Sequence, residues 1–118
     1  DGVVVATSTG STAYSAAAGG PIVDPAIDAF VLSPICPFSL SNRPLVLNSD
    51  GKLTIKVLPS RGAEIVLSCD GQEIIKLMSD DIIIMEKNKE KALLVGCDSS
   101  VFYSALQSKL NWSGGPNA

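Results

Sequence analysis

Small hydroxyl-bearing residues gather near the start of the chain, in the segment VVVATSTGSTAYSAAAGGPIV (residues 3–23), which has no charged residue. Serine and threonine hydroxyls both donate and accept hydrogen bonds, and free amides at a helix start add donors. Asp1 and Asp70 add acceptors, and Tyr14 adds an aromatic face. This inventory suits a neutral, flat, polar group such as a carboxamide or an adenine edge. The hydroxyls belong to Thr7, Ser8, Thr9, Ser11 and Thr12.

Two common phosphate-binding loops do not fit this segment. The P-loop needs two spaced glycines followed by Lys and Ser or Thr, and the dinucleotide fingerprint needs three glycines in its first turn. The stretch TSTGSTAY (residues 7–14) has one glycine and no lysine. A plainer alternative stays open from the chemistry alone, in which the hydroxyls only cap a short helix and satisfy nearby backbone groups.

The surrounding pattern predicts the elements that hold this segment. Residues 3–6 (VVVA) are short, β-branched and apolar, as in a strand buried on both faces. Residues 7–12 follow as a turn, and residues 13–18 favour a short helix that Gly19, Gly20 and Pro21 end. Residues 29–33 are expected to form the next strand, before the proline-punctuated stretch SPICPFSLSNRPLVLN.

From Leu45 onward, apolar and polar residues alternate. One face of the predicted strand has the apolar residues Leu53, Ile55 and Val57. The other face has Lys52, Thr54, Lys56 and Leu58, as in a strand with one face in a core. The stretch EIVLSCDGQEIIKL indicates two strands joined by a tight turn at Asp70 and Gly71. A further hairpin is expected in DDIIIMEKNKEKALLVGC, with its reversal near Asn88.

The carboxy-terminal part predicts a helix. Asp98, Ser99 or Ser100 can cap it, and residues 111–115 should end it. Apolar residues recur at helical spacing at Phe102, Ala105, Leu106 and Leu110. We therefore expect a mainly β fold, an antiparallel, sandwich-like domain with short helices, one of them near the carboxy terminus.

Length and composition limit the class of protein. With 118 residues and 46% apolar content, the chain can form a single domain around one core. A net charge of −3 and scattered basic residues argue against nucleic acid or membranes as partners. Three distant cysteines without any histidine argue against zinc and indicate a reduced, cytoplasmic protein. Without an initiator Met before its first strand, the chain is expected to be a piece of a longer protein.

Four stretches, in this order, resemble the carboxy-terminal half of NAD kinases, the family that phosphorylates the 2′-hydroxyl of the adenosine ribose of NAD to make NADP. They are DGVVVATSTGSTAYSAAAGGPIV, LSPICPFSLSNRPLVL, SCDGQ and VFYSALQSKLNW, within residues 1–112. The resemblance implies an amino-terminal α/β domain, a β-rich carboxy-terminal domain and an active site between them. Residues 1–118 would then be the single β-rich, NAD-binding domain. The general-base aspartate would lie in the other domain, so no catalytic residue is expected in this chain.

The resemblance also implies a set of NAD-binding residues. Asp1 stands where the family has a carboxylate near the nicotinamide end of NAD, and Gln72 stands at another nucleotide-contacting position. The family often shares these contacts between subunits, which implies a homodimer or homotetramer. A continuous run lining the nucleotide is formed by Thr12, Ala13, Tyr14, Ser15, Ala16 and Ala17.

Three residues depart from the family pattern. Phe38 stands where the family usually has a histidine, so a hydrogen bond from an imidazole is lost. Ser8 replaces a common proline, and Ala17 replaces a serine. These changes bear on details of affinity rather than on the resemblance itself.

The implied reaction uses ATP or inorganic polyphosphate as donor, with a divalent metal such as magnesium balancing the phosphate charge. Partners would be NAD or NADP and the protein's own amino-terminal domain, while the chain by itself is expected to be inactive. Phe102, Leu106, Leu110 and Trp112 are expected to pack toward that domain. Two alternatives remain, an assembly module without nucleotide binding of its own and a related two-domain lipid kinase such as a diacylglycerol kinase.

Overall fold

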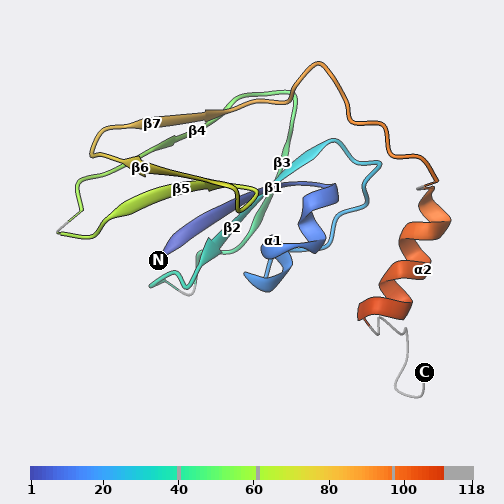
Figure 1. Cartoon of the computed structure of the whole chain (residues 1–118). Helices are drawn as coiled ribbons and strands as arrows, with labels where there is room; N and C mark the ends of the chain where they lie inside the picture. Colours follow the sequence, from blue (N-terminus) through green and yellow to red (C-terminus); the bar gives the residue numbers. More distant parts are fainter. Residues whose placement is uncertain (40, 61, 97, 111–118) are drawn as a thin grey trace. The chain divides into compact units, whose positions relative to one another are not determined.

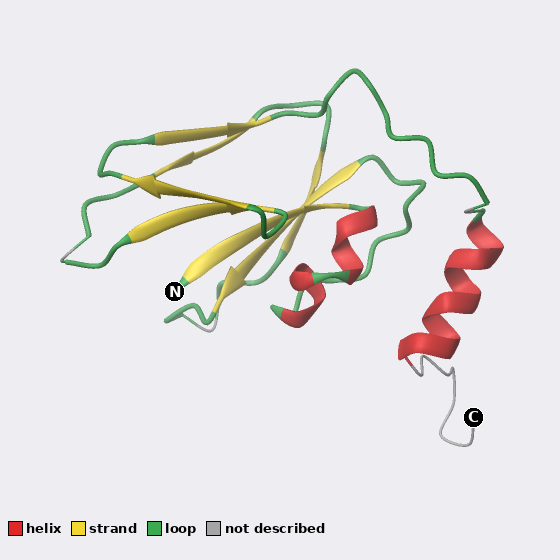
Figure 2. Ribbon diagram, in the orientation of Figure 1, coloured by secondary structure: helices red, strands yellow, loops and turns green. Residues whose placement is uncertain are grey.

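The computed structural model describes residues 1–39, 41–60, 62–96 and 98–110, in which every strand pair is antiparallel (Figure 1). Figure 2 shows that strands make up most of the regular structure, with few helices. The mainly β fold class is thereby confirmed. The elements are β1 (Gly2–Thr7), η1 (Thr9–Thr12), α1 (Tyr14–Ala17), β2 (Ala29–Ile35), β3 (Leu45–Asn48), β4 (Leu53–Lys56), β5 (Ile65–Cys69), β6 (Glu73–Leu77), β7 (Ile82–Met85) and α2 (Ser99–Leu110).

The chain divides into two compact units. One unit takes in Asp1–Ser49 with the described residues of Asn88–Ala118, and the other takes in Asp50–Lys87. That the whole chain forms a single domain stays a prediction. None of the helices in the described ranges has the length and apolar character that a membrane span requires.

The first unit contains a three-stranded sheet in the order β1-β2-β3. β2 lies in the middle, and its residues Val31 and Ser33 are completely buried. Residues 3–6 do form part of a strand, but their predicted burial on both faces is wrong, since Val3 is 42% exposed. The reason is that β1 is an edge strand of this sheet and pairs with β2 alone.

The second unit consists of two antiparallel pairs, β4 with β7 and β5 with β6. The predicted alternation in β4 is confirmed, because Leu53 and Ile55 are half-buried while Thr54 and Lys56 are exposed. The Asp70–Gly71 turn between β5 and β6 is also confirmed. Both residues have positive φ, 49° and 70°, as the two central residues of a type I′ turn require, and Gln72 completes the connection between the paired residues Cys69 and Glu73.

The hairpin predicted around Asn88 is wrong. β7 pairs with β4, which lies far earlier in the sequence, and residues 91–96 form no strand. Leu93 and Val95 in this stretch are each 90% exposed. Alternating side chains specify the two faces of a strand but not its partner, so the pattern could not distinguish these pairings.

Helix α2 begins as predicted, with Asp98 as its cap. The Asp98 carboxylate accepts hydrogen bonds from the Ser100 hydroxyl at 2.6 Å and the Val101 amide at 3.0 Å, and these bonds lower its pKa. Leu106 is buried within the chain and Phe102 is half-buried, whereas Leu110 is 51% exposed. Leu106 is therefore covered by this chain itself and is not available to pack against another domain. Trp112 lies outside the described residues.

We predict that Gly71→Ala destabilises the chain by about 1 kcal/mol, because alanine at positive φ is strained. Gly51→Ala is the matched control in the same unit, since Gly51 has an ordinary φ and likewise no neighbour within 4 Å. Its free energy of unfolding should stay within about 0.5 kcal/mol of the unaltered chain. Urea unfolding followed by circular dichroism measures both, and equal losses would contradict the turn assignment.

Candidate functional site

The polar segment after β1 folds back over the sheet. β1 ends at Thr7, which pairs with Phe30 of β2, and η1 and α1 follow. The Ser15 hydroxyl of α1 then lies 2.9 Å from that of Ser33, whose partner in β1 is Val4. The chain has thus returned from the level of Thr7 to that of Val4, toward the beginning of β1.

Asp1 lies at the beginning of β1 and is exposed. Its backbone nitrogen donates a hydrogen bond of 2.9 Å to the carbonyl oxygen of Ile35, the last residue of β2. The segment with Phe38 leaves the sheet at this same end, and the Phe38 side chain is fully exposed. Asp1 therefore lies at the end of the sheet toward which α1 returns.

The side chains of the polar segment divide into an inward and an outward set. Ser8, Ser11 and Ser15 are at most 5% exposed. The outward set is Thr9, Thr12, Ala13, Tyr14 and Ala17, while Ala16 is half-buried. Tyr14, at 67% exposure, presents most of its ring. Of the run predicted to line a nucleotide, Ser15 is the member whose side chain faces inward.

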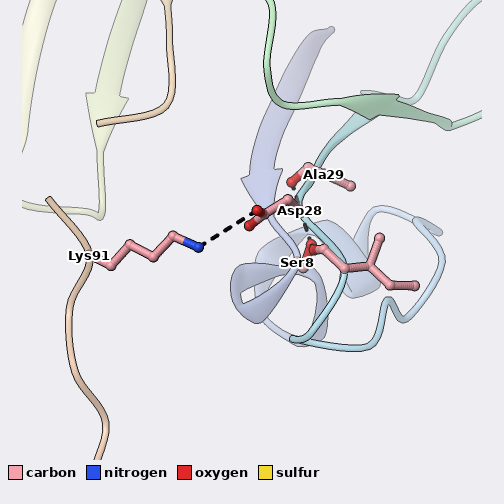
Figure 3. Close-up of polar contacts among 5 residues, drawn as sticks. Ser8, Asp28, Ala29 and Lys91 are labelled. Atoms are coloured by element: carbon pink, nitrogen blue, oxygen red, sulfur yellow. Dashed lines mark hydrogen bonds and ion pairs between the residues drawn. The ribbon is translucent and has the colours of Figure 1, made fainter. Parts of the chain in front are cut away.

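The buried serines bind backbone groups of the loop that follows α1. Ser11 Oγ donates to the Ser8 carbonyl at 2.6 Å and accepts from the Val23 amide at 2.9 Å. Ser8 Oγ donates to the Ile27 carbonyl and lies 3.5 Å from that of Ala29 (Figure 3). Neither η1 nor α1 has a side-chain cap. The helix-capping part of the plainer alternative is thus wrong for these serines. They do satisfy backbone groups, one of them nearby at Ser8 and others in the distant loop at Val23 and Ile27.

Two polar contacts connect this loop to residues nearer the carboxy terminus. Lys91 Nζ lies 3.6 Å from a carboxylate oxygen of Asp28, with both side chains more than half exposed (Figure 3). The Tyr103 hydroxyl of α2 donates to Asp24 at 3.0 Å. This hydrogen bond, together with the negative charge of Asp24, raises the pKa of Tyr103. Exposed ion pairs add little stability, so the Lys91–Asp28 contact is not expected to hold the fold.

The end of α1 explains the paired glycines. The amide of Gly19 donates to the Ala16 carbonyl at 2.9 Å, and that of Gly20 donates to the Ser15 carbonyl at 2.8 Å. This is the Schellman pattern, which needs a left-handed residue after the helix, and Gly19 has a φ of +81°. The predicted stop is confirmed, although the helix is shorter than residues 13–18.

Sequence reasoning missed Ser33 and the close approach of Gly20 to it. Ser33 interrupts the otherwise apolar strand stretch AFVLSPI, and that interruption is the signal that could have pointed to a buried polar contact. Nothing in the sequence indicates that its partner is Ser15, because the two residues are 18 positions apart.

Gln72 belongs to the second unit, where it is exposed and follows the Asp70–Gly71 turn. The backbone amide of Gln72 donates a hydrogen bond to the Cys69 carbonyl at 3.0 Å, and this bond closes the turn. The part that Gln72 takes in binding stays a prediction.

The described residues do not form a metal cage. No three acidic, cysteine or histidine side chains among them lie close enough together to hold an ion.

Comparison with known proteins identifies the family. The family model for the ATP-NAD kinase C-terminal domain matches residues 1–97, which include the polar segment and every strand from β1 to β7. The chain belongs to the NAD kinase family. The resemblance found in the sequence is thereby confirmed.

Relatives and solved structures agree with this assignment. The NAD kinases of Treponema denticola and Treponema pallidum are 60% and 55% identical to the chain, over 97% of its length but only 40% and 37% of theirs. The crystal structure of yeast NADH kinase with NADH is similar at a TM-score of 0.72, with 30% identity over 98% of this chain and 36% of that one. An NAD kinase from Archaeoglobus fulgidus, solved with ATP, gives 0.64, with 35% identity over 75% and 33%. The chain thus spans about two fifths or less of these NAD kinase family members.

We predict that Ser11→Ala lowers the free energy of unfolding by about 1–3 kcal/mol, because the buried Val23 amide loses its acceptor. The neighbouring Thr12→Ala is the matched control and should change it by less than about 0.5 kcal/mol, since Thr12 is exposed. Urea unfolding of both variants tests this. Similar losses at the two positions would contradict the inward and outward division.

We predict that Tyr103 titrates above its ordinary pKa of about 10 in the folded chain. Because the unfolded chain loses this proton first, the stabilisation is present below about pH 10 and is lost as pH rises through the raised pKa. Asp24→Asn should move the pKa of Tyr103 back toward 10. Tyrosinate absorbance, with the Tyr103→Phe variant subtracted, measures the shift, and an unchanged pKa in Asp24→Asn would contradict the contact.

Proposed function

We propose that this chain binds the NAD acceptor in an enzyme that transfers a phosphoryl group to the 2′-hydroxyl of the adenosine ribose, giving NADP. The observation that carries the proposal is the outward face of residues 12–14 in a member of the NAD kinase family. Tyr14, 67% exposed, offers a ring on which a nucleotide base can stack. The proposal includes Asp1, Gln72 and the run from Thr12 to Ala17 as ligand contacts, with Ser15 contributing through its backbone. The protein is also proposed to be cytoplasmic.

The chemistry of the segment suits the uncharged parts of a dinucleotide. Arg43 is the first basic residue in the sequence, so no side chain before it carries a positive charge that could balance a phosphate. Hydroxyls, backbone amides and the Tyr14 ring instead match amide and base groups, which need hydrogen bonds and stacking. The phosphate charges would be balanced by groups elsewhere in the protein and by a magnesium ion that accompanies the donor.

In this proposal the chain contributes by positioning. Phosphoryl transfer depends mainly on alignment and electrostatics, and a misplacement of about 1 Å can cost on the order of a hundredfold in rate. The general base would lie in the part of the protein outside this chain, so the chain alone would not catalyse the transfer. ATP or polyphosphate would be the donor, and the solved A. fulgidus relative, determined with ATP, supports the former.

A second function, assembly of a homodimer or homotetramer, is favoured by exposed apolar side chains in the second unit. Ile82 and Ile84 lie on one face of the β4–β7 pair and are each 59% exposed, and Ile74 of β6 is 73% exposed. Assembly and nucleotide binding are compatible in one protein. Titration with NAD, combined with sedimentation, separates them in the isolated chain. A lipid kinase receives no support, because the matched family and relatives are NAD or NADH kinases.

We predict that Tyr14→Ala in the full-length protein raises the Kd for NAD by roughly 5- to 150-fold, the loss of one base–aromatic stack of about 1–3 kcal/mol. Tyr14→Phe keeps the ring and should stay within about threefold of the unaltered protein. Isothermal titration calorimetry measures the Kd, and NADP formation from NAD with ATP or polyphosphate measures activity.

The control for general effects on folding is Tyr103→Ala, which removes the same side chain at a second exposed position and should leave the Kd for NAD within about threefold. If Tyr14→Ala binds NAD as the unaltered protein does, residues 12–14 do not form the base-binding face. If the unaltered protein forms no NADP from any donor, the proposed kinase function itself is wrong.

A further inference from the structure

Ser33 is a fully buried hydroxyl in the middle of an apolar strand. Its side chain has no exposed surface, and that of Ser15 is 1% exposed. Their oxygens lie 2.9 Å apart, so each satisfies the other within the interior. A buried hydroxyl without a partner is costly, and this pair therefore fixes the distance between α1 and β2.

Gly20 completes this contact by leaving space for it. A Cβ atom placed on Gly20 would lie 2.4 Å from Ser33 Oγ and 2.5 Å from Ser15 Oγ. It would also lie 2.8 Å from the backbone oxygen of Ser15, which no side-chain rotation can relieve. The residues Ser15, Gly20 and Ser33, which we call the docking cluster, thus bring α1, its exit loop and β2 together.

Helix α1 depends on this cluster for its place. It has four residues and no side-chain cap, too short to be stable without tertiary contacts. Tyr14 immediately precedes Ser15 in the helix, so its ring moves with the Ser15 backbone. The contact between Ser15 and Ser33 therefore constrains the backbone position from which the Tyr14 side chain extends.

We propose that Ser33 is a positioning residue for the dinucleotide site, acting through Ser15. Its hydroxyl holds α1 on β2 and thereby sets the affinity of the outward residues for NAD. Ser15 contributes its inward hydroxyl to this contact and does not touch the ligand with its side chain. This inference rests on the proposed NAD-binding function.

The test compares Ser33→Ala and Ser15→Ala with Ser49→Ala in the full-length protein. Ser49 is the matched control, since it is 4% exposed in the same unit and its hydroxyl has no partner. The KM for NAD should rise about tenfold in Ser33→Ala and Ser15→Ala, the effect of one lost buried hydrogen bond. The KM for the phosphoryl donor should stay within about twofold, and Ser49→Ala should leave both constants unchanged.

Two further variants separate positioning from loss of folded protein. The double variant Ser15→Ala with Ser33→Ala should raise the KM for NAD no more than either single variant, because it leaves no orphaned hydroxyl. Ser33→Cys, close in size to serine, should restore part of the affinity if Ser33→Ala folds poorly. A merely structural role would lower the active fraction, and thus kcat, without changing the KM for NAD.

Hydrogen exchange tests the cluster independently of any nucleotide. The amides of Gly19 and Gly20, which close the end of α1, should exchange faster in Ser33→Ala than in Ser49→Ala. Unchanged exchange would show that Ser33 does not hold α1. Faster exchange with an unchanged KM for NAD would overturn the positioning role alone. Failure of the unaltered protein to bind NAD overturns the proposed function, and with it the inference, before any variant is made.

Discussion

The need of buried hydroxyls for partners determines how the chain turns after its first strand. Ser8, Ser11 and Ser15 are all inside the first unit, and each is hydrogen-bonded there to the backbone or to Ser33. In water these hydroxyls would lose little by being free, but inside a protein each orphan costs about 1–3 kcal/mol. A conformation that satisfies all three leaves the intervening residues, Thr12 and Tyr14, on the outside.

This arrangement gives a short helix a defined position without a large apolar contact. Four helical residues supply little stability by themselves, and the apolar part of the segment is mostly alanine. Hydrogen bonds are directional, so they fix the helix more narrowly than an alanine surface would. For an enzyme family whose chemistry depends on alignment, such rigidity beside the acceptor is an understandable use of polar interior groups.

Sequence patterns predicted the features that depend on neighbouring residues. The Asp70–Gly71 turn, the Asp98 cap and the glycine stop after α1 each follow from local backbone requirements, and the structure has all of them. Strand partners did not follow, because β7 could pair with any strand of suitable length and it pairs with β4. The sequence also did not predict which side chains of the polar segment face inward, because η1 and α1 are too short to show a repeating pattern. The partner of Ser15, Ser33, could not be predicted because it lies 18 positions along the chain.

In the proposed site, Thr12, Ala13, Tyr14 and Ala17 present a face to the dinucleotide, while the side chains of Ser8, Ser11 and Ser15 remain inside. The most direct measurement is the nuclear Overhauser effect between the base protons of bound NAD and the ring protons of Tyr14 in the full-length protein. We expect a strong effect at Tyr14, with the amides of Gly19 and Gly20 still protected from exchange in the complex. This placement of the dinucleotide would be contradicted if bound NAD gave no Overhauser effect to the Tyr14 ring, or if the amides of Gly19 and Gly20 exchanged freely in the complex.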